Sequence, residues 1–123
     1  MYEGLKILIT GAGGLGVLLA DACVNNGIKL MDMPVDLDEA FKKLIPPFGA
    51  SGNPIDITGG EPPETYKNAI LLALRDSRVH SLILGYWHTI ITPPKIFSNL
   101  VCEALQEVAA EGISKPIVAA LAG

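Results

Sequence analysis

Residues 7–16 read Ile-Leu-Ile-Thr-Gly-Ala-Gly-Gly-Leu-Gly, and the rest of the chain is interpreted around this stretch. The apolar run at its start predicts a short strand that is buried on both faces. The glycines that follow permit a tight turn in which backbone N–H groups are not covered by side chains. Helical spacing then begins, with apolar residues at positions 15, 18, 19, 22 and 23. Free N–H groups at the positive end of a helix favour binding of an anion at this turn.

The composition is that of one apolar domain. With 123 residues, 50% of them hydrophobic and 18% charged, the chain is long enough for a modest core. A net charge of −4 without a basic cluster argues against a nucleic-acid partner. No signal peptide and no bilayer-spanning apolar run is recognised, so we expect a cytoplasmic protein without a membrane partner. Cys23 and Cys102 stand among apolar residues and are expected to be reduced core residues.

Strands and helices are expected to alternate along the chain. The predicted strands cover residues 6–10, 28–31, 79–84 and 116–121. The predicted helices cover residues 14–25, a segment from the capping box at Asp36 and Glu39 to the prolines at 46–47, a segment beginning at 62–63, and one opened by 92–94 and stopped by Gly112. Such alternation predicts an α/β fold with a mainly parallel sheet, in which the first strand lies near the centre.

We expect a single domain over residues 1–123 that is a piece of a larger protein. No linker or internal repeat divides the chain. The last predicted strand ends at Leu121, where a doubly wound domain often continues, so a truncated C-terminus is one explanation for this ending.

The segment 48–63 follows no regular period, yet the apolar residues within it argue against disorder. Ile55 and Ile57 are expected to form a short strand or an anchor, and Asn53 and Asp56 to bond the local backbone. Ligands of such sheets gather at the carboxyl ends of the strands, where the loops 11–14 and 85–91 are placed. The loop 51–60 is expected to join them.

A literal dinucleotide fingerprint is also present, because Gly11, Gly13 and Gly16 have the G-x-G-x-x-G spacing. Asp32, after the second predicted strand, lies near the distance expected for a ribose-binding acid. The helix, long loop and second helix that follow do not fit a Rossmann unit, which returns to its third strand after one crossover. A Rossmann-type dinucleotide-binding domain and a non-catalytic flavodoxin-like interaction module therefore stand as alternatives.

Isolated polar residues carry less weight. His88 follows the third predicted strand, where a ligand contact is conceivable, but no Cys, Asp or Glu stands nearby to complete a metal or nucleophile set. Ser51 lacks the G-x-S-x-G context of a nucleophile. We therefore expect no metal site in this chain.

Two stretches, residues 9–23 and 52–60, resemble the NDP-forming acyl-CoA synthetases, which include the ADP-forming acetyl-CoA synthetases and are related to succinyl-CoA synthetase. The resemblance is to their flavodoxin-like ligase domain and covers nearly the whole chain. It implies a three-layer α/β/α fold with a mainly parallel sheet. It also implies a part in an acid–thiol ligase reaction, in which a carboxylate, CoA and ATP or GTP give acyl-CoA through an acyl phosphate, or the reverse. A histidine on a different domain then carries the phosphoryl group.

The resemblance also assigns roles to individual residues. The amino end of the first helix would face the phosphoryl group, with phosphate contacts at Gly11, Ala12, Gly13 and Gly14. Substrate contacts would fall on Thr10, Thr89, Ile90 and Ile91, with Asn53 and Asp56 on a loop near the site. Thr10 replaces a substrate-contacting asparagine of succinyl-CoA synthetase, and the stretch 86–89 replaces a smaller glycine-rich one, which argues against succinate as the substrate.

The resemblance implies partners for this chain. No histidine in the expected glycine-rich context, no CoA-binding domain and no ATP-grasp domain is recognised, so no catalytic residue is expected here. A CoA-binding domain with the phosphohistidine, and an ATP-grasp domain or subunit, would supply them. No cofactor is expected to bind this chain directly, whereas ATP or GTP, Mg²⁺ and CoA would be used by the full enzyme.

Overall fold

The structure is a computed structural model that describes residues 5–30, 32–47 and 49–122. Its elements follow one another as β1 (Leu5–Thr10), α1 (Gly13–Asn25), α2 (Val35–Leu44), β2 (Ile55–Asp56), α3 (Pro63–Arg75), β3 (Val79–Trp87), α4 (Pro94–Ala110) and β4 (Ile117–Ala122). Within these ranges no helix is both long and apolar enough to cross a membrane.

The four strands form one parallel sheet in the order β2-β1-β3-β4, which confirms the predicted α/β class. β1 pairs on both sides, with Thr10 opposite Asp56 of β2 and opposite Gly85 of β3. The register therefore brings the carboxyl ends of these three strands to one edge of the sheet. β3 extends to Trp87, so residues 85–87, which were expected in a loop, continue the strand.

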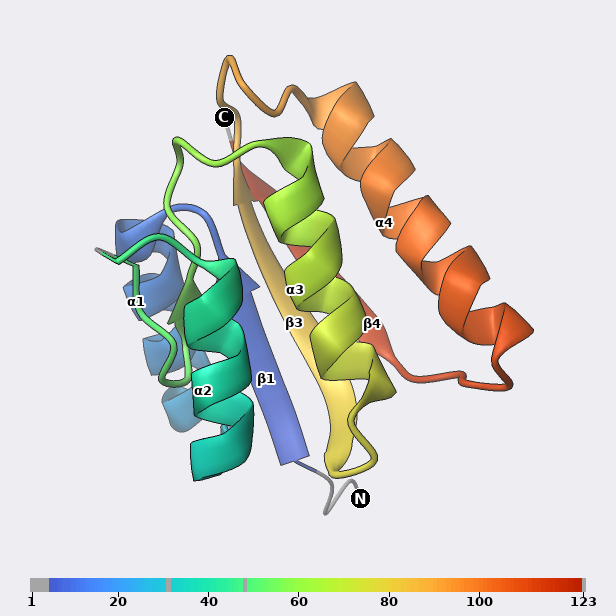
Figure 1. Ribbon diagram of the computed structural model, residues 1–123. Coiled ribbons are helices and arrows are strands. Elements are labelled where there is room, and N and C mark those ends of the chain that lie inside the picture. Colours follow the sequence, from blue (N-terminus) through green and yellow to red (C-terminus); the bar gives the residue numbers. More distant parts are fainter. Residues whose placement is uncertain (1–4, 31, 48, 123) are drawn as a thin grey trace.

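The sheet separates two unequal layers of helices (Figure 1). α1 covers one face alone, and the side chain of Leu19 approaches Gly85 of β3 there. α2, α3 and α4 cover the other face, over a core that includes Ile7, Ile9 and Leu84. Side chains alternate along a strand, so Leu8 is buried on the α1 face, and the two-sided burial predicted for β1 is confirmed.

The predicted strand over 28–31 is wrong for the part that can be described. Residues 28–30 have no strand structure, and residue 31 lies outside the described residues. The place beside β1 is taken by β2, which Asn53 helps to fasten: the Leu8 N–H donates to Asn53 Oδ1 at 3.0 Å, and Asn53 Nδ2 donates to the Lys6 carbonyl at 2.8 Å. Asn53 therefore bonds the backbone of a distant strand, at Lys6 and Leu8.

Helix boundaries match the sequence better than helix caps and faces do. Gly27 and Gly112 follow α1 and α4 with φ of +70° and +80°, as expected for glycine stops. The capping box at Asp36 is wrong, because α2 begins at Val35 after Pro34, and no side chain caps it. Asp36 instead pairs with Arg78 across the fold.

The buried face of α1 also differs from the prediction. Gly16 and Cys23 are buried, whereas Val17, Leu18 and Val24 are more than half exposed. Residues 15–20 are apolar without interruption apart from Gly16, so apolar spacing could not select the face. Cys102, expected in the core, is exposed.

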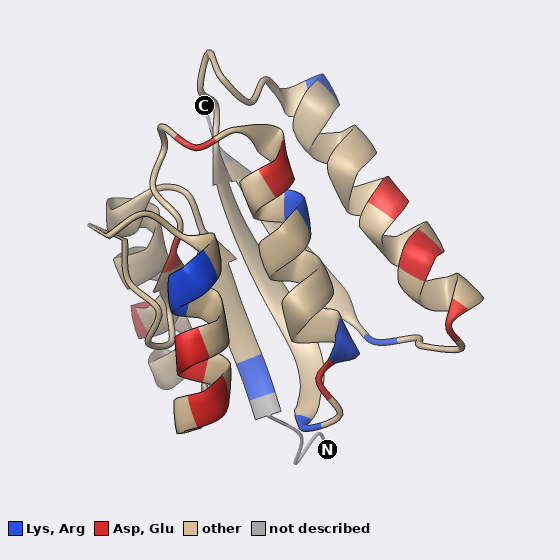
Figure 2. Ribbon diagram, in the orientation of Figure 1, with Lys and Arg blue, Asp and Glu red and all other residues tan. Residues whose placement is uncertain are grey.

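Charged residues lie mainly on the helices and loops (Figure 2). Counting Asp, Glu, Lys and Arg, the four strands contain only Lys6 and Asp56. Among the residues that the structure describes, Asp56 is therefore the single carboxylate within a strand, and it stands at the carboxyl edge of the sheet.

Candidate functional site

The glycine turn connects the carboxyl end of β1 to α1, and Thr10 shapes it from beneath. Thr10 is 1% exposed, and its Oγ1 accepts the Ala12 N–H at 3.0 Å and donates to the Ala12 carbonyl at 3.1 Å. The Ala12 N–H is therefore already engaged. Ala12 is the N-cap of α1 but offers no side-chain cap, and the first turn of α1 contains no acidic residue.

The free amides of the turn belong to the next two residues. Gly13 and Gly14 are exposed, and their N–H groups donate no hydrogen bond within residues 5–30, 32–47 and 49–122. The first intrahelical bond is the one from the Gly16 N–H to the Ala12 carbonyl, at 2.9 Å. Two uncovered amides at a positive helix end are suited to a phosphate or carboxylate oxygen.

Asp56 brings a negative charge to the same helix end. A Cβ atom built on Gly13 would lie 2.9 Å from Asp56 Oδ2. Asp56 Oδ1 accepts the Thr58 N–H at 2.9 Å, which is the local backbone bond expected from sequence. Mutual backbone bonds with Ala50, at 2.8 and 3.0 Å, hold Asp56 in place. The carboxylate stabilises an otherwise uncapped helix and shares that end with any incoming anion.

Tyr66 of α3 fills the space over Gly11. A Cβ atom on Gly11 would overlap the Tyr66 hydroxyl oxygen and lie 2.6 Å from Tyr66 Cζ, so any side chain here has to displace the Tyr66 ring. Tyr66 is 3% exposed and packs edge-on against Phe97. Burial, followed by the nearby Tyr86 and Asp56, raises the pKa of Tyr66 to about 12, so the phenol is neutral at physiological pH.

Three loops meet at the turn, as expected for the segments 11–14, 51–60 and 85–91. A Cβ atom on Gly59 would lie 3.3 Å from the Gly11 carbonyl oxygen and 3.7 Å from Thr89 Cγ2. Thr58 has a φ of +67°, which is rare for a β-branched residue, and its hydroxyl is buried without a hydrogen-bond partner. Ile90 and Ile91 are 96% and 49% exposed on the same loop as Thr89.

Other polar residues singled out in the sequence lie apart from the turn or have structural partners. Asp32 is exposed and follows no strand within the described residues, so the ribose-binding arrangement of a Rossmann unit is missing here. Ser51 Oγ donates to Asp38 Oδ1 at 2.7 Å, and this bond, with the Lys42 ion pair, lowers the pKa of Asp38. His88 is exposed.

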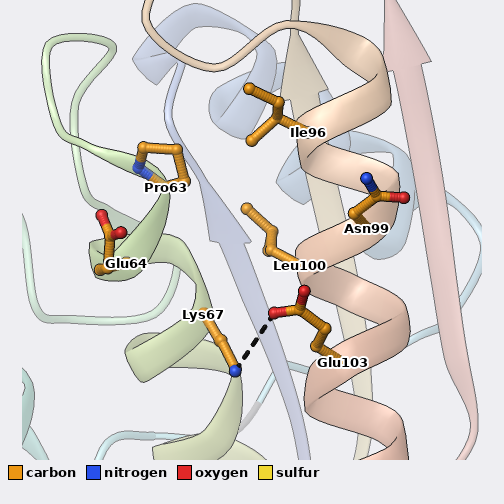
Figure 3. Close-up of a pocket in the computed structure, with 7 residues that line it drawn as sticks. All are labelled: Pro63, Glu64, Lys67, Ile96, Asn99, Leu100 and Glu103. Carbon is orange, nitrogen blue, oxygen red and sulfur yellow. Dashed lines mark hydrogen bonds and ion pairs between the residues drawn. The ribbon is translucent and has the colours of Figure 1, made fainter.

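A separate groove runs between α3 and α4 and has a volume of about 450 Å³. Its lining residues are Pro63, Glu64, Lys67, Ile96, Asn99, Leu100 and Glu103 (Figure 3). Lys67 spans it and pairs with Glu103 at 3.3 Å and with Glu107 at 2.8 Å. The groove includes no residue of the glycine turn, and its one cation is neutralised.

The described residues around the turn offer hydrogen-bond donors suited to an anion rather than a reactive group. Thr10, Asp56, Thr58, Tyr66 and Thr89 surround it, and none of these is a nucleophile next to a base. Within the described ranges, no three His, Cys, Asp or Glu side chains gather in a way that could hold a metal ion.

The fold and this edge define a flavodoxin-like α/β domain with a glycine turn at the end of its first strand. The chain belongs to the Ligase-CoA domain family, whose model matches residues 6–123. It is 34% identical over 117 residues to the alpha subunit of acetate–CoA ligase (ADP-forming) I from Pyrococcus furiosus, covering 95% of this chain and 24% of that subunit. It is 31% identical over 81 residues to 4-hydroxybutyrate–CoA ligase (ADP-forming) from Nitrosopumilus maritimus, covering 66% of this chain and 12% of that protein.

A solved structure agrees closely with the fold. It is described as a dinucleotide-forming acetyl-coenzyme A synthetase 1 from Ca. Korarchaeum cryptofilum, with a TM-score of 0.89 and 37% identity over 98% of this chain and 26% of that one. The same protein is also solved in complex with phosphate and ADP. The chain thus spans about a quarter of the Pyrococcus subunit and of the Korarchaeum protein, and 12% of the Nitrosopumilus ligase.

Sequence reasoning did not identify Tyr66 or Thr58 as site residues. Tyr66 lies on the buried apolar stripe of α3, but its hydroxyl reaches the turn from 55 positions further along the chain. A phenol among the small aliphatic residues of this stripe was the one available signal. Thr58 gave no signal, because a positive φ at a β-branched residue is set by tertiary contacts.

Proposed function

We propose that this chain is the domain of an ADP-forming acyl-CoA synthetase at which the amino end of α1 receives a phosphoryl group. The observation that carries the proposal is the pair of exposed, unpartnered N–H groups of Gly13 and Gly14 at the carboxyl edge of a parallel sheet. Membership of the Ligase-CoA family supports it. So does the similarity to a synthetase that was solved with phosphate and ADP.

In the proposed mechanism this domain supplies electrostatic stabilisation rather than a reacting group. A histidine on another domain carries the phosphoryl group, and the free amides and helix dipole offset the charge on its oxygens. Preorganised donors of this kind are commonly worth several kcal/mol where water is excluded. Asp56 competes for the same helix end, so the phosphoryl group has to displace the Asp56 carboxylate or share the helix end with it.

The proposed substrate is a carboxylate, whose contacts fall on the loop after β3. Thr89, Ile90 and Ile91 lie on this loop, and the two isoleucines are exposed and suited to a small aliphatic chain. Thr10, also assigned to the substrate, lies beneath the turn and acts by shaping it. The relatives named as acetate and 4-hydroxybutyrate ligases agree with a short-chain acid.

The proposed partners are a CoA-binding domain with the phosphohistidine and an ATP-grasp domain or subunit. Together they would bind CoA, ATP or GTP, and Mg²⁺. The Pyrococcus subunit and the Korarchaeum protein are about four times as long as this chain, which leaves room for such domains.

Gly14→Val in the complete ligase tests the proposal. No atom lies within 4 Å of a Cβ on Gly14, so the variant should fold while its side chain shields the two amides. Phosphorylation of the histidine by ATP or by acyl phosphate should fall by about 10² to 10³-fold, as for the loss of an oxyanion donor.

Ala22→Val is the matched control, because Ala22 is exposed in the second half of the same helix. It should leave phosphorylation unchanged. Normal phosphoenzyme formation in folded Gly14→Val would refute the proposed function.

A further inference from the structure

The Tyr66 hydroxyl is aimed at the glycine turn and has no hydrogen-bond partner among the residues that the structure describes. Tyr66 is 3% exposed, and its hydroxyl oxygen occupies the position where a side chain on Gly11 would begin. The ring is buried, but the hydroxyl oxygen is not among the fully buried polar atoms, so it is accessible to a group that docks at the glycine turn.

Tyr86, in the same core, is a buried tyrosine whose hydroxyl does have a hydrogen-bond partner. Both tyrosine rings contact Phe97, but the Tyr86 hydroxyl donates to the Thr92 carbonyl at 2.7 Å. The two residues therefore share burial and aromatic packing and differ in whether the hydroxyl is bonded. Thr58 also has a buried hydroxyl without a partner, and its backbone carbonyl oxygen lies close to Gly11.

The charges and hydrogen-bond donors around the Tyr66 hydroxyl indicate which kind of ligand it would bind. The raised pKa of Tyr66 keeps the proton on the phenol, so the hydroxyl can donate. The described side chains that approach Gly11, Gly13 and Gly59 are those of Tyr66, Asp56 and Thr89, none of which is a cation, so we expect an anion here to be held by neutral donors. A phenol and backbone amides are such donors, and they match an oxygen of a phosphate or a carboxylate.

We propose that the Tyr66 hydroxyl donates a hydrogen bond to an oxyanion oxygen of the group that docks at the glycine turn, forming a subsite with Gly11 and the Gly13 and Gly14 amides. This inference rests on the proposed function and adds a side-chain donor on α3 to it. The oxyanion belongs either to the phosphoryl group or to the carboxylate of the acyl substrate.

Tyr66→Phe in the complete ligase tests the subsite, with inorganic phosphate and acetate as separate probes in calorimetric titrations. A hydrogen bond to a charged group corresponds to roughly a tenfold change in Kd or more. Weaker binding of phosphate alone identifies the phosphoryl group as the ligand, and weaker binding of acetate alone identifies the carboxylate. Unchanged Kd values for both probes overturn the inference.

Tyr86→Phe is the matched control. It should lower the melting temperature, because the Thr92 carbonyl loses its donor, and leave both Kd values unchanged.

Tyr66→Phe should melt like the wild type, and a large loss of stability would show that its hydroxyl is bonded within the domain, which also overturns the inference. If Gly14→Val abolishes histidine phosphorylation while Tyr66→Phe binds both probes normally, only the subsite fails. If Gly14→Val has no effect, the proposed function itself fails.

Discussion

At Gly11 the space for a side chain is occupied by Tyr66, which lies on α3. The Tyr66 ring occupies the space over Gly11, whereas Gly14, three residues later, faces open solvent. Neither glycine has a positive φ, so their requirements differ in packing and not in backbone conformation.

This contrast predicts opposite effects for two alanine substitutions. Gly11→Ala should lower the free energy of unfolding by about 1–3 kcal/mol, because the methyl group forces Tyr66 aside. Gly14→Ala should leave that free energy unchanged or raise it by up to about 1 kcal/mol, because alanine is the better helix former. Urea unfolding of both variants measures the difference, and equal midpoints would contradict the packing described at Gly11.

At the scale of elements, Arg78 links the loop before β3 to the start of α2. Its guanidinium pairs with Asp76 at 2.7 Å and with Asp36 at 2.9 Å. Hydrogen bonds from Arg78 are the main cause of the lowered pKa of both carboxyls. The Arg78–Asp36 pair thus joins α2 to the loop before β3, although the two residues are 42 positions apart in the sequence.

This linkage predicts a pH dependence with a definite sign. A carboxyl whose pKa is lowered by folding stabilises the fold fully above its unfolded pKa of about 3.9, and the contribution is lost as pH falls through the folded value. The melting temperature of the wild type should therefore fall more steeply below about pH 4 than that of Arg78→Gln. Because the pairs are largely exposed, the difference should be small and should shrink in high salt. Parallel curves for the two proteins would exclude a role for Arg78 in acid stability.

At the scale of the whole molecule, the central strands of the sheet are more deeply buried than the edge strand β4. β1 and β3 are paired on both sides and include fully buried residues such as Ile9 and Leu84. β4 is an edge strand, and Val118 and Leu121 within it are 64% and 62% exposed. The centre of the sheet should therefore open only with global unfolding, and the β4 edge by local fluctuation.

Native-state hydrogen exchange checks this difference. The amides of Ile9 and Leu84 should exchange at least about tenfold more slowly than the slowest amide of β4. Similar rates in β3 and β4 would show that the edge strand is held more firmly than its pairing indicates. In the complete ligase, slower exchange confined to β4 would locate a contact with another domain.

The local elements of the fold could be predicted from sequence because their signals are local. The apolar run 7–9, the glycine turn and the glycine stops at 27 and 112 each depend on the conformational preferences of a few consecutive residues. The parallel α/β class and the meeting of the three loops followed from the alternation of those elements.

Sequence alone did not predict that β2 lies beside β1, which residues of α1 are buried, or that Tyr66 lies against the glycine turn. The run 28–30 alternates apolar and charged residues as a strand can, but Asn53 bonds β1 from the segment before β2, across more than forty positions of the sequence, and β2 is the strand that pairs with β1. α1 is apolar nearly all round, so only its packing on the sheet decides which residues are buried.

By itself, then, the sequence determined where an anion could meet free amides, because a glycine turn at the start of a helix exposes them whatever surrounds it. Only the tertiary structure decided what shares that place, since Asp56 and Tyr66 arrive there from β2 and α3. Their approach depends on long-range packing, which leaves no periodic trace in the sequence.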